Sequence, residues 1–434
     1  MGRVTSGWNG AWGLVALAVA SSSAWLGGAS GPAGQRVLAI AERSNSNPSI
    51  AASGAFVAVA WVVSGESGRA DVYVSASADA GQTFGAPLLV SGSAGADVSG
   101  EQPPRVVISP RAGRPPALQV VWTSKAASGT RLLDVRSDDG GRRFSSPSLV
   151  AGSEAPGNRG WESVAVTPAG DAFAIWLDHR ELAAGTTTMN HAAHQPGATT
   201  ADGAARAQRS KLMFGAVDGG GAALDVAAGV CYCCKTSLAA DADGRFYAAW
   251  RHVYPGNVRD IAFTMSTDGG KTFAAPIRVS EDHWVLDGCP ENGPALSVDA
   301  RRRIHVVWPT LLPAASGSTA EPDLALFYAM SSDGRRFTAR QRIPSAAGAR
   351  HPQLVIDELG ALMAVWDEPA GGRRRIAVAR GTVDVNGVAS FSRQTIDDAD
   401  SASYPVVAMT NRGPLVAWSS RSMTTPPVIR LARF

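Results

Sequence analysis

Short apolar segments that end in tryptophan recur along the chain. Each segment is rich in Val, Ala, Leu or Phe and is followed by a stretch with Gly, Pro or Asp, which favours turns between β-strands. The interval between successive tryptophans is long enough for one four-stranded unit, and no amphipathic helix is expected within it. The seven tryptophans are Trp61, Trp122, Trp176, Trp250, Trp308, Trp366 and Trp418. Repeats of this length predict an all-β, seven-bladed propeller of four-stranded antiparallel blades.

A second motif follows several of these strands. Three segments align without gaps, SADAGQTFGAP, SDDGGRRFSSP and STDGGKTFAAP, and SSDGRRF matches with one residue fewer. A tight turn explains the pattern, because Asp caps backbone N–H groups, Gly adopts a positive φ and the aromatic residue packs under the hairpin. The structural aspartates of this motif are predicted to be Asp79, Asp139, Asp268 and Asp333.

These turns resemble the Asp boxes of sialidases and other proteins with bacterial neuraminidase repeats. The resemblance covers nearly the whole chain beyond its N-terminal segment, and it implies a sialidase-like propeller whose Asp boxes lie on the face away from any active site. Three units lack a clean Asp box, so six blades are the alternative to seven. The last unit has only three strands, and residues 36–42 (RVLAIAE) are expected to supply the fourth and close the ring.

The N-terminal segment, 1–30, is predicted to be a signal peptide. Arg3 precedes an apolar run at 11–20, and small residues follow, as in an export signal. The propeller domain is then expected over 36–434, in the periplasm or outside the cell. An uncleaved anchor is the alternative, but the run is shorter than the ~20 residues of a spanning helix, and the mature chain is expected to lack a membrane span.

The charge balance excludes one class of partner. Forty Lys and Arg residues stand against 37 Asp and Glu residues, a net charge of +3, which does not indicate a nucleic-acid-binding surface. We expect a monomer whose partner is a small ligand, a glycan or a protein.

Propeller topology assigns the loops to two faces. The Asp box joins the third and fourth strands of a blade, so the loops that lead into each first strand lie on the opposite face, called the top face here. Function usually resides on loops that such a rigid scaffold holds. Most histidines and all four cysteines fall on predicted top-face loops.

The cysteines and histidines of units three to six form a soft set of metal ligands, suited to copper or zinc. The candidate ligands are Cys231, Cys233, Cys234, Cys289, His283, His351, His191 and His194. The C-x-C-C and G-C-P segments resemble a subgroup of secreted bacterial Asp-box proteins. Disulfides are the alternative, because an exported chain with an even number of cysteines usually pairs them.

The sialidase resemblance also implies catalytic candidates. Such enzymes bind a carboxylate through three arginines and use a Tyr/Glu pair as nucleophile. Here the candidates are Tyr404, Glu162, Arg105, Arg259 and Arg350. The family's early Arg-Ile-Pro signature is missing, because unit one has NPSIAA at 47–52.

The interpretation that these observations favour is a ligand- or metal-binding module that uses the top face. A sialidase-like glycoside hydrolase and a protein-interaction scaffold with disulfide-locked loops are the alternatives, so the sequence leaves open whether the chain is an enzyme.

Overall fold

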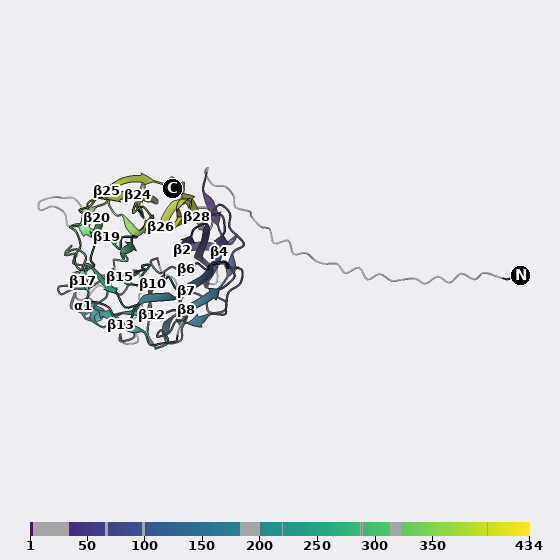
Figure 1. Ribbon diagram of the computed structural model, residues 1–434, viewed down its shortest axis with the longest axis horizontal. Coiled ribbons are helices and arrows are strands. Elements are labelled where there is room, and N and C mark those ends of the chain that lie inside the picture. The colour runs from purple at the N-terminus through teal and green to yellow at the C-terminus, as the bar shows by residue number, and fades with distance from the viewer. Residues whose placement is uncertain are drawn as a thin grey trace.

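The computed structural model describes residues 1–2, 34–65, 68–97, 100–182, 200–218, 220–286, 288, 290–312, 323–396 and 398–434. Its strands form seven four-stranded antiparallel sheets arranged as a ring (Figure 1). The predicted seven-bladed propeller is therefore confirmed, and the six-bladed alternative is wrong.

The first four blades follow the order of the chain. Blade I contains β2 (Ser44–Ser53), β3 (Phe56–Ser64), β4 (Ala70–Ser77) and β5 (Leu88–Leu89). Blade II contains β6 (Arg105–Ser109), β7 (Ala117–Ala126), β8 (Gly129–Ser137) and β9 (Ser148–Leu149). Blade III contains β10 (Arg159–Val166), β11 (Ala172–Asp178), β12 (Lys211–Ala216) and β13 (Leu224–Ala228). Blade IV contains β14 (Ser237–Ala240), β15 (Phe246–Arg251), β16 (Ile261–Ser266) and β17 (Ile277–Arg278).

The remaining three blades also follow the order of the chain, except that the last blade takes one strand from the N-terminal end. Blade V contains β18 (Ala295–Val298), β19 (Ile304–Leu312), β20 (Asp323–Ser331) and β21 (Gln341–Arg342). Blade VI contains β22 (Arg350–Ile356), β23 (Leu362–Ala370), β24 (Arg373–Val383) and β25 (Ala389–Thr395). Blade VII contains β26 (Ser401–Thr410), β27 (Gly413–Arg421), β28 (Val428–Arg433) and β1 (Arg36–Leu38). Because β1 pairs with β28, the N-terminal strand closes the ring as expected.

The expectation that no helix lies between successive tryptophans of the repeat is wrong. A short helix, α1 (Thr200–Gln208), lies in the insert between β11 and β12. The insert carries no apolar stripe of helical period, which is why the hydrophobic pattern did not predict it. Among the described residues, no helix is long and apolar enough to cross a membrane.

The core lies between neighbouring blades. Each of the seven clusters of buried apolar residues in the described part of the chain combines side chains from two adjacent blades. The seven tryptophans of the repeat are at most 1% exposed and stand in these interfaces. The sequence repeat is therefore the repeat of one packing contact.

The Asp box is a hydrogen-bonded turn, as predicted. Asp268 Oδ1 accepts the backbone N–H of Thr272 at 3.0 Å, and Asp268 Oδ2 accepts its hydroxyl at 2.6 Å. These bonds stabilise the ionised carboxylate and lower the pKa of Asp268. Gly270, two residues further on, has a φ of 85°, a conformation that glycine adopts without steric cost.

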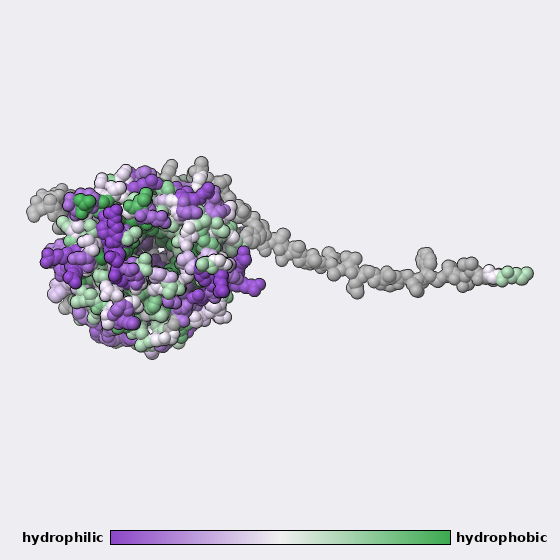
Figure 2. All heavy atoms as spheres, viewed as in Figure 1, coloured by the Kyte–Doolittle hydropathy of each residue, from purple (hydrophilic) through white to green (hydrophobic). Residues whose placement is uncertain are grey.

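The first strand of each blade contacts the first strand of the next one all round the ring, so these strands line the centre of the ring. Figure 2 shows that one face of the ring is hollowed at this centre. Neighbouring strands are antiparallel, so the first and third strands of a blade run the same way. The starts of the first strands therefore lie on the face opposite the Asp boxes, which is the predicted top face.

Candidate functional site

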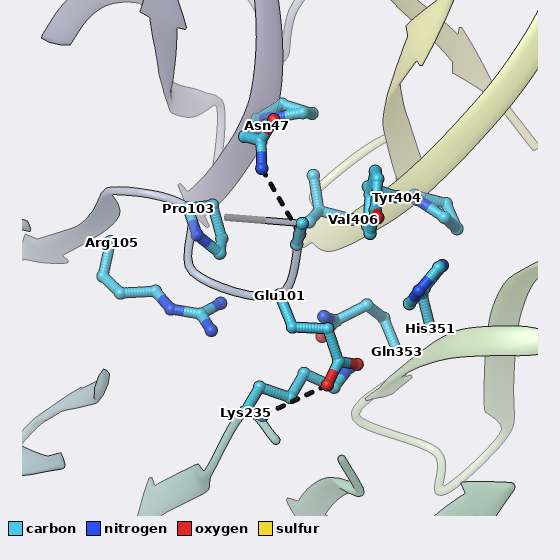
Figure 3. A pocket seen from close by; sticks show the side chains of 12 residues that line it. Asn47, Glu101, Pro103, Arg105, Lys235, His351, Gln353, Tyr404 and Val406 are labelled. Carbon is cyan, nitrogen blue, oxygen red and sulfur yellow. Dashed lines mark hydrogen bonds between the residues drawn. The ribbon is translucent and has the colours of Figure 1, made fainter. Parts of the chain in front are cut away.

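A pocket lies where the first strands of several blades begin (Figure 3). Its empty volume is about 300 Å³, open solvent at the mouth included. The polar residues that line it come from five blades and include Asn47, Glu101, Arg105, Lys235, His351 and Tyr404. The ring thus brings together side chains from the first blade to the last.

Three of these residues share an unusual backbone conformation. Asn47, His351 and Tyr404 have φ values of 53°, 54° and 53°, in the left-handed region that costs a non-glycine residue of order 1–3 kcal/mol. Each stands in a β-bulge at the start of its strand, and each precedes a proline. Bulges redirect side chains and are frequent beside active sites. Repetition of this bulge in three blades indicates that the backbone is shaped to point side chains at the pocket.

His351 and Tyr404 form a pair held by a buried carboxylate. Their ring centroids are 4.2 Å apart. Asp367 Oδ2 lies 2.6 Å from His351 Nδ1 and accepts the backbone N–H of Tyr404 at 3.1 Å. Burial by itself would raise the pKa of Asp367, but His351 and Arg374 lower it below its usual value. Because Nδ1 of His351 is bound to a carboxylate, Nε2 is the ring atom left for proton transfer.

The Tyr404 hydroxyl is in a negative environment. Burial raises the pKa of Tyr404 to about 12, and the charges of Asp367 and Glu101 raise it too. A Cβ on Gly100 would lie 2.0 Å from Tyr404 Oη, so the phenol packs directly on the backbone at that position. Tyr404 is therefore a neutral proton donor at ordinary pH.

Lys235 and Glu101 connect four blades. The backbone N–H groups of Lys235 and Gly293 donate to Glu101 Oε2 at 3.2 Å and 2.9 Å. Lys235 Nζ donates to the carbonyl of Pro352. Burial lowers the pKa of Lys235 to about 8, although the charge of Glu101 acts in the other direction. Lys235 thus brings a buried cation to the pocket.

Arg105 and Glu162 form a second buried pair beside it. Arg105 Nε donates to the backbone carbonyl of Glu162 at 2.7 Å, and Glu162 Oε2 accepts the hydroxyl of Thr123 at 3.0 Å. Burial raises the pKa of Glu162 to about 7 and lowers that of Arg105. Arg105 Nη2 and Glu162 Oε1 are buried and have no hydrogen-bond partner among the described residues. Arg105 lines the pocket, so this unpaired donor can serve an anionic ligand.

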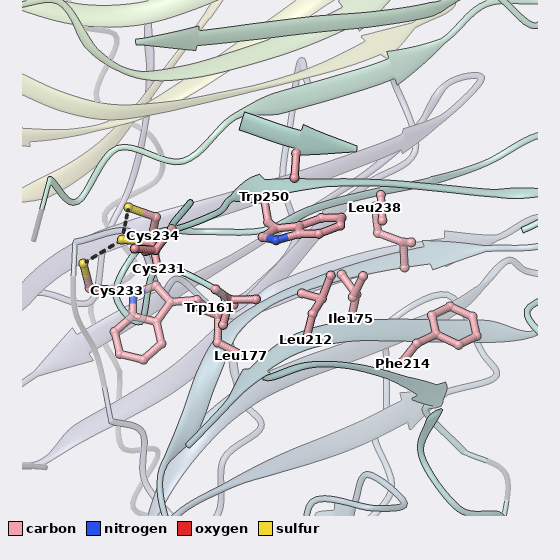
Figure 4. Close-up of a cluster of buried hydrophobic side chains, with 14 of the residues drawn as sticks. Trp161, Ile175, Leu177, Leu212, Phe214, Cys231, Cys233, Cys234, Leu238 and Trp250 are labelled. Carbon is pink, nitrogen blue, oxygen red and sulfur yellow. Dashed lines mark hydrogen bonds between the residues drawn. The ribbon is translucent and has the colours of Figure 1, made fainter. Parts of the chain in front are cut away.

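Three cysteines meet in a second cluster, between blades III and IV (Figure 4). The Sγ atoms of Cys231, Cys233 and Cys234 lie within 4.8 Å of one another, and a metal ion could be held there. Each side chain is 1% exposed. Cys231 and Cys234 are free, whereas Cys233 is disulfide-bonded.

Arg259 lies directly on this cluster. Its Nη1 donates to Cys231 Sγ at 3.1 Å. The hydrogen bond with Cys234 and the charges of Arg259 and Arg251 lower the pKa of Cys231, while burial raises that of Cys234. The arrangement therefore favours a thiolate at Cys231 and a thiol at Cys234.

The other predicted site residues lie elsewhere. Arg350 is exposed, and neither it nor Arg259 is among the residues that line the pocket. His283 has a side chain that is 66% exposed, 3.9 Å from Glu281, and His351 lies in the pocket. Cys289, His191 and His194 lie outside the described residues.

Sequence reasoning did not select Glu101, Lys235 or Asp367 as site residues. Glu101 and Lys235 belong to the loops that lead into β6 and β14. Their position in these top-face loops was the signal that could have identified them as site residues. Asp367 directly follows Trp366, and an acid immediately after the strand-ending tryptophan was a signal that went unused.

Scans for related proteins support the fold. No family model matches the chain, and a search of curated proteins finds no match. A polysaccharide lyase, an ulvan lyase of family PL25 bound to -[GlcA(1-4)Rha3S]-, is 10% identical over 90% of this chain and 94% of its own, with a TM-score of 0.55. An α-L-arabinofuranosidase from Fusarium graminearum is 12% identical over 90% and 93%, with a TM-score of 0.46. A Hadza microbial sialidase is 15% identical over 86% and 73%, with a TM-score of 0.45.

The chain shares the propeller fold of the ulvan lyase. At these identities the likeness concerns the fold alone, and the chemistry must come from the pocket.

Proposed function

We propose that the chain is a carbohydrate-active enzyme that cleaves an anionic glycan at the top-face pocket. The observation that carries the proposal is the His351–Tyr404 pair, held by Asp367 beside two buried cations, Arg105 and Lys235. A glycan is a suitable ligand because charged and polar side chains line the pocket, and because the ulvan lyase of similar fold was solved with a uronate-containing saccharide.

The cations suit a carboxylated sugar. Arg105 has an unpaired buried N–H, and a guanidinium binds carboxylate groups through directed hydrogen bonds. Lys235 adds a second positive charge. Neutralising a carboxylate makes the proton on the neighbouring carbon more acidic, so His351 Nε2 could remove it as a base. Tyr404 could then protonate the leaving oxygen.

This division of roles favours elimination over hydrolysis. A sialidase-type hydrolysis needs an ionised Tyr404 as nucleophile, and burial with Asp367 and Glu101 raises the pKa of Tyr404 to about 12. It also needs three converging arginines, and Arg105 is the single arginine that lines the described pocket. An acid–base elimination needs neither.

The test is to assay the purified chain on polymers of uronic acids, on sialylated oligosaccharides and on neutral glycans of matched size. Reducing ends report any cleavage, and ultraviolet absorbance of an unsaturated sugar reports elimination alone. We expect both signals on a uronate polymer, and losses of ~10²–10⁴-fold in kcat for His351→Ala and Tyr404→Phe. Tyr73→Phe, in β4 and away from the pocket, is the matched control and should retain full activity.

The same assay separates the alternatives. If reducing ends form without an unsaturated product, the reaction is hydrolysis rather than elimination. Absence of cleavage on every carboxylated glycan, or a Tyr404→Phe variant with full activity, would contradict the proposal itself.

We also propose a second function, the binding of a soft metal ion by the cysteine cluster. Cys231 Sγ lies 3.9 Å from Cys233 Sγ and 3.7 Å from Cys234 Sγ, and two thiolates on one tetrahedral ion at ~2.3 Å lie about 3.8 Å apart. With Cys233 in a disulfide, two thiols remain. Copper(I) fits this set better than zinc, because thiolates select copper(I) and structural zinc needs four ligands.

Metal analysis tests this second function. The purified chain is loaded with copper(I) or zinc, freed of weakly bound ions with a chelator, and assayed by mass spectrometry. We expect about one copper ion per chain, and none in the Cys231→Ser/Cys234→Ser variant. Equal metal content in both proteins would exclude these thiols as ligands.

Export remains part of the proposal. The charged start, the apolar run at 11–20 and the small residues after it support cleavage of the N-terminal segment 1–30 and a location in the periplasm or outside the cell. N-terminal sequencing of the protein recovered from its host tests this.

A further inference from the structure

One polar side chain of the pocket has no role in the proposed reaction. Gln353, in β22, lines the pocket, and within the described part of the chain its amide group has no hydrogen-bond partner. By contrast, the protein itself holds Glu101, which accepts the backbone N–H of Gly293 at 2.9 Å, and Asn47, whose Nδ2 donates to the carbonyl of Gly100 at 3.3 Å. The amide of Gln353 is therefore available to a ligand.

The backbone holds this amide at a fixed place relative to the proton-transfer groups. Gln353 lies two residues after His351 on the same strand, and both side chains line the pocket. The β-bulge that follows Arg350 ends at Gln353, which pairs with Val365 in the regular register of β22 and β23. Val365 is fully buried, so a packed strand supports Gln353 from behind.

The charges around the pocket differ from one side to the other. Figure 3 shows the side chains of Arg105 and Gln353 extending toward each other from opposite sides of the pocket, with Glu101 between them in this view. A sugar carboxylate is attracted to Arg105, whereas a second anionic group placed at Gln353 would meet the carboxylate of Glu101, which lines the same pocket. Gln353 itself is neutral, and its amide offers an acceptor oxygen and two N–H donors, which suit a hydroxyl group.

We propose that Gln353 is a specificity-determining residue, which binds a free ring hydroxyl of the uronate sugar whose carboxylate Arg105 binds. The pocket then accepts a uronate in which this hydroxyl is free and rejects one that carries a sulfate on it. The inference rests on the proposed function, because it requires that this pocket holds a carboxylated sugar.

Two contacts from opposite sides would orient the sugar for the reaction. A ring bound by its carboxylate alone can turn about that contact, and a second contact at Gln353 removes this freedom. The proton next to the carboxylate is then presented to His351 in one geometry. Gln353 thus contributes to binding and orientation, while His351 and Tyr404 transfer the protons.

The test is a binding measurement with methyl glycosides of uronic acids, which carry no second sugar to be eliminated. Each glycoside is prepared with all its ring hydroxyls, with one hydroxyl removed, and with one hydroxyl sulfated. Calorimetric titration of the full wild-type chain gives the dissociation constants. We expect removal of one particular hydroxyl to raise Kd ~10-fold, because one hydrogen bond is lost, and sulfation of the same hydroxyl to raise Kd at least as much.

A variant identifies the residue that binds this hydroxyl. Gln353→Met keeps the length of the side chain and removes its hydrogen-bonding groups. It should weaken binding of the parent glycoside ~10-fold and leave binding of the analogue without that hydroxyl unchanged, because the interaction is already absent there. Gln394→Ala, at an exposed position in β25 of the same blade, is the matched control and should bind every glycoside as wild type does. Circular dichroism on heating checks that both variants fold.

The outcomes separate this inference from the proposed function. Equal losses for the parent and for every analogue in Gln353→Met would show that Gln353 has only a structural role, and would overturn the inference. A wild-type chain that binds all analogues alike, or binds no uronate glycoside, would overturn it as well. Cleavage of polymers is measured separately, so a chain that recognises the hydroxyl through Gln353 but cleaves no glycan would contradict the enzymatic proposal alone.

Discussion

Glu162 shows what burial does to a single carboxyl group. It is 1% exposed, and its nearest cation, Arg105, bonds to its backbone carbonyl at 2.7 Å rather than to its carboxylate. Desolvation therefore outweighs the attraction of Arg105, and the pKa of Glu162 rises from 4.5 to about 7.

This raised pKa predicts a pH-dependent stability. The folded chain keeps the proton on Glu162 up to about pH 7, whereas the unfolded chain releases it near pH 4.5. The stabilisation is complete below pH 4.5 and is lost as the pH rises through 7. Between pH 4.5 and 8 the free energy of unfolding of Glu162→Gln should therefore rise relative to wild type, by about 3 kcal/mol at most. Urea titrations at several pH values measure it. The exposed Glu358→Gln is the control, and parallel profiles for wild type and Glu162→Gln would contradict the prediction.

Asp367 and Glu368 are adjacent acids with different tasks. Both are fully buried, but Asp367 bonds to His351, whereas Glu368 Oε2 accepts the indole N–H of Trp366 at 2.9 Å. Position along one strand decides which acid reaches His351, because successive residues point to opposite sides.

This difference predicts that Asp367→Asn and Glu368→Gln separate activity from stability. Each should lower the free energy of unfolding by about 1–3 kcal/mol, since each weakens a buried hydrogen-bond network. Asp367→Asn should also lower kcat at least ~10-fold and change its pH profile, because Asp367 positions the proton-transfer group His351. Glu368→Gln should retain kcat. Equal kcat for the two variants would mean that Asp367 has only a structural role.

At the scale of elements, each blade repeats one tryptophan contact. The indole N–H of Trp308 donates to Asp282 and that of Trp418 to Asp398, at 2.6 Å and 2.8 Å. Trp250 is the exception among the seven, because its indole nitrogen has no hydrogen-bond partner among the described residues. Blade IV, which carries the cysteine cluster, thus departs from the repeat.

The Asp box of blade I gives a test of packing between blades. Gly81 has a φ of 82°, and a Cβ there would lie 2.4 Å from Leu415 Cδ2 of β27. Gly54 has a φ of 59°, and a Cβ there would have no neighbour within 4 Å. Gly54→Ala should cost about 1 kcal/mol of stability through backbone strain alone. Gly81→Ala should cost ~1–3 kcal/mol more, because overpacking is added. Thermal unfolding compares them, and equal losses would show that Leu415 moves aside freely.

For the whole molecule, the decisive feature is closure of the ring by a strand from the other end of the chain. Val37 pairs with Arg430, and Leu38 with Ile429. Leu38 is 8% exposed and packs in the cluster shared by blades VII and I. Without β1, the edge of β28 would be left unpaired.

A truncation tests this closure. A chain that begins at Gly34 keeps β1, and a chain that begins at Arg43 lacks it. We expect the shorter chain to unfold several degrees lower, since burial of Leu38 alone stabilises by ~1.5–3 kcal/mol, and to associate through its open edge. Calorimetry and light scattering measure both effects. Identical melting of the two monomeric chains would contradict a role for β1 in closure.

The sequence by itself predicted seven blades, with six as the alternative, and separated the two faces of the ring. Both follow from local patterns, the tryptophan at the end of a buried strand and the Asp-box turn, which a short segment specifies through its own packing and hydrogen bonds. Closure was also predictable, because one strand was missing at one end and one was left over at the other. The helix α1 was not, because its insert lacks an apolar stripe.

Only the tertiary structure decided which residues meet. Four blades supply the pocket side chains of Arg105, Lys235, His351 and Tyr404. Their convergence depends on the curvature of the ring and on bulges that no local sequence pattern predicts. The same holds for Arg259, which was a candidate for a carboxylate clamp and lies instead on Cys231. Local periodicity specifies each blade, whereas a site shared by several blades is specified by how they pack around a common centre.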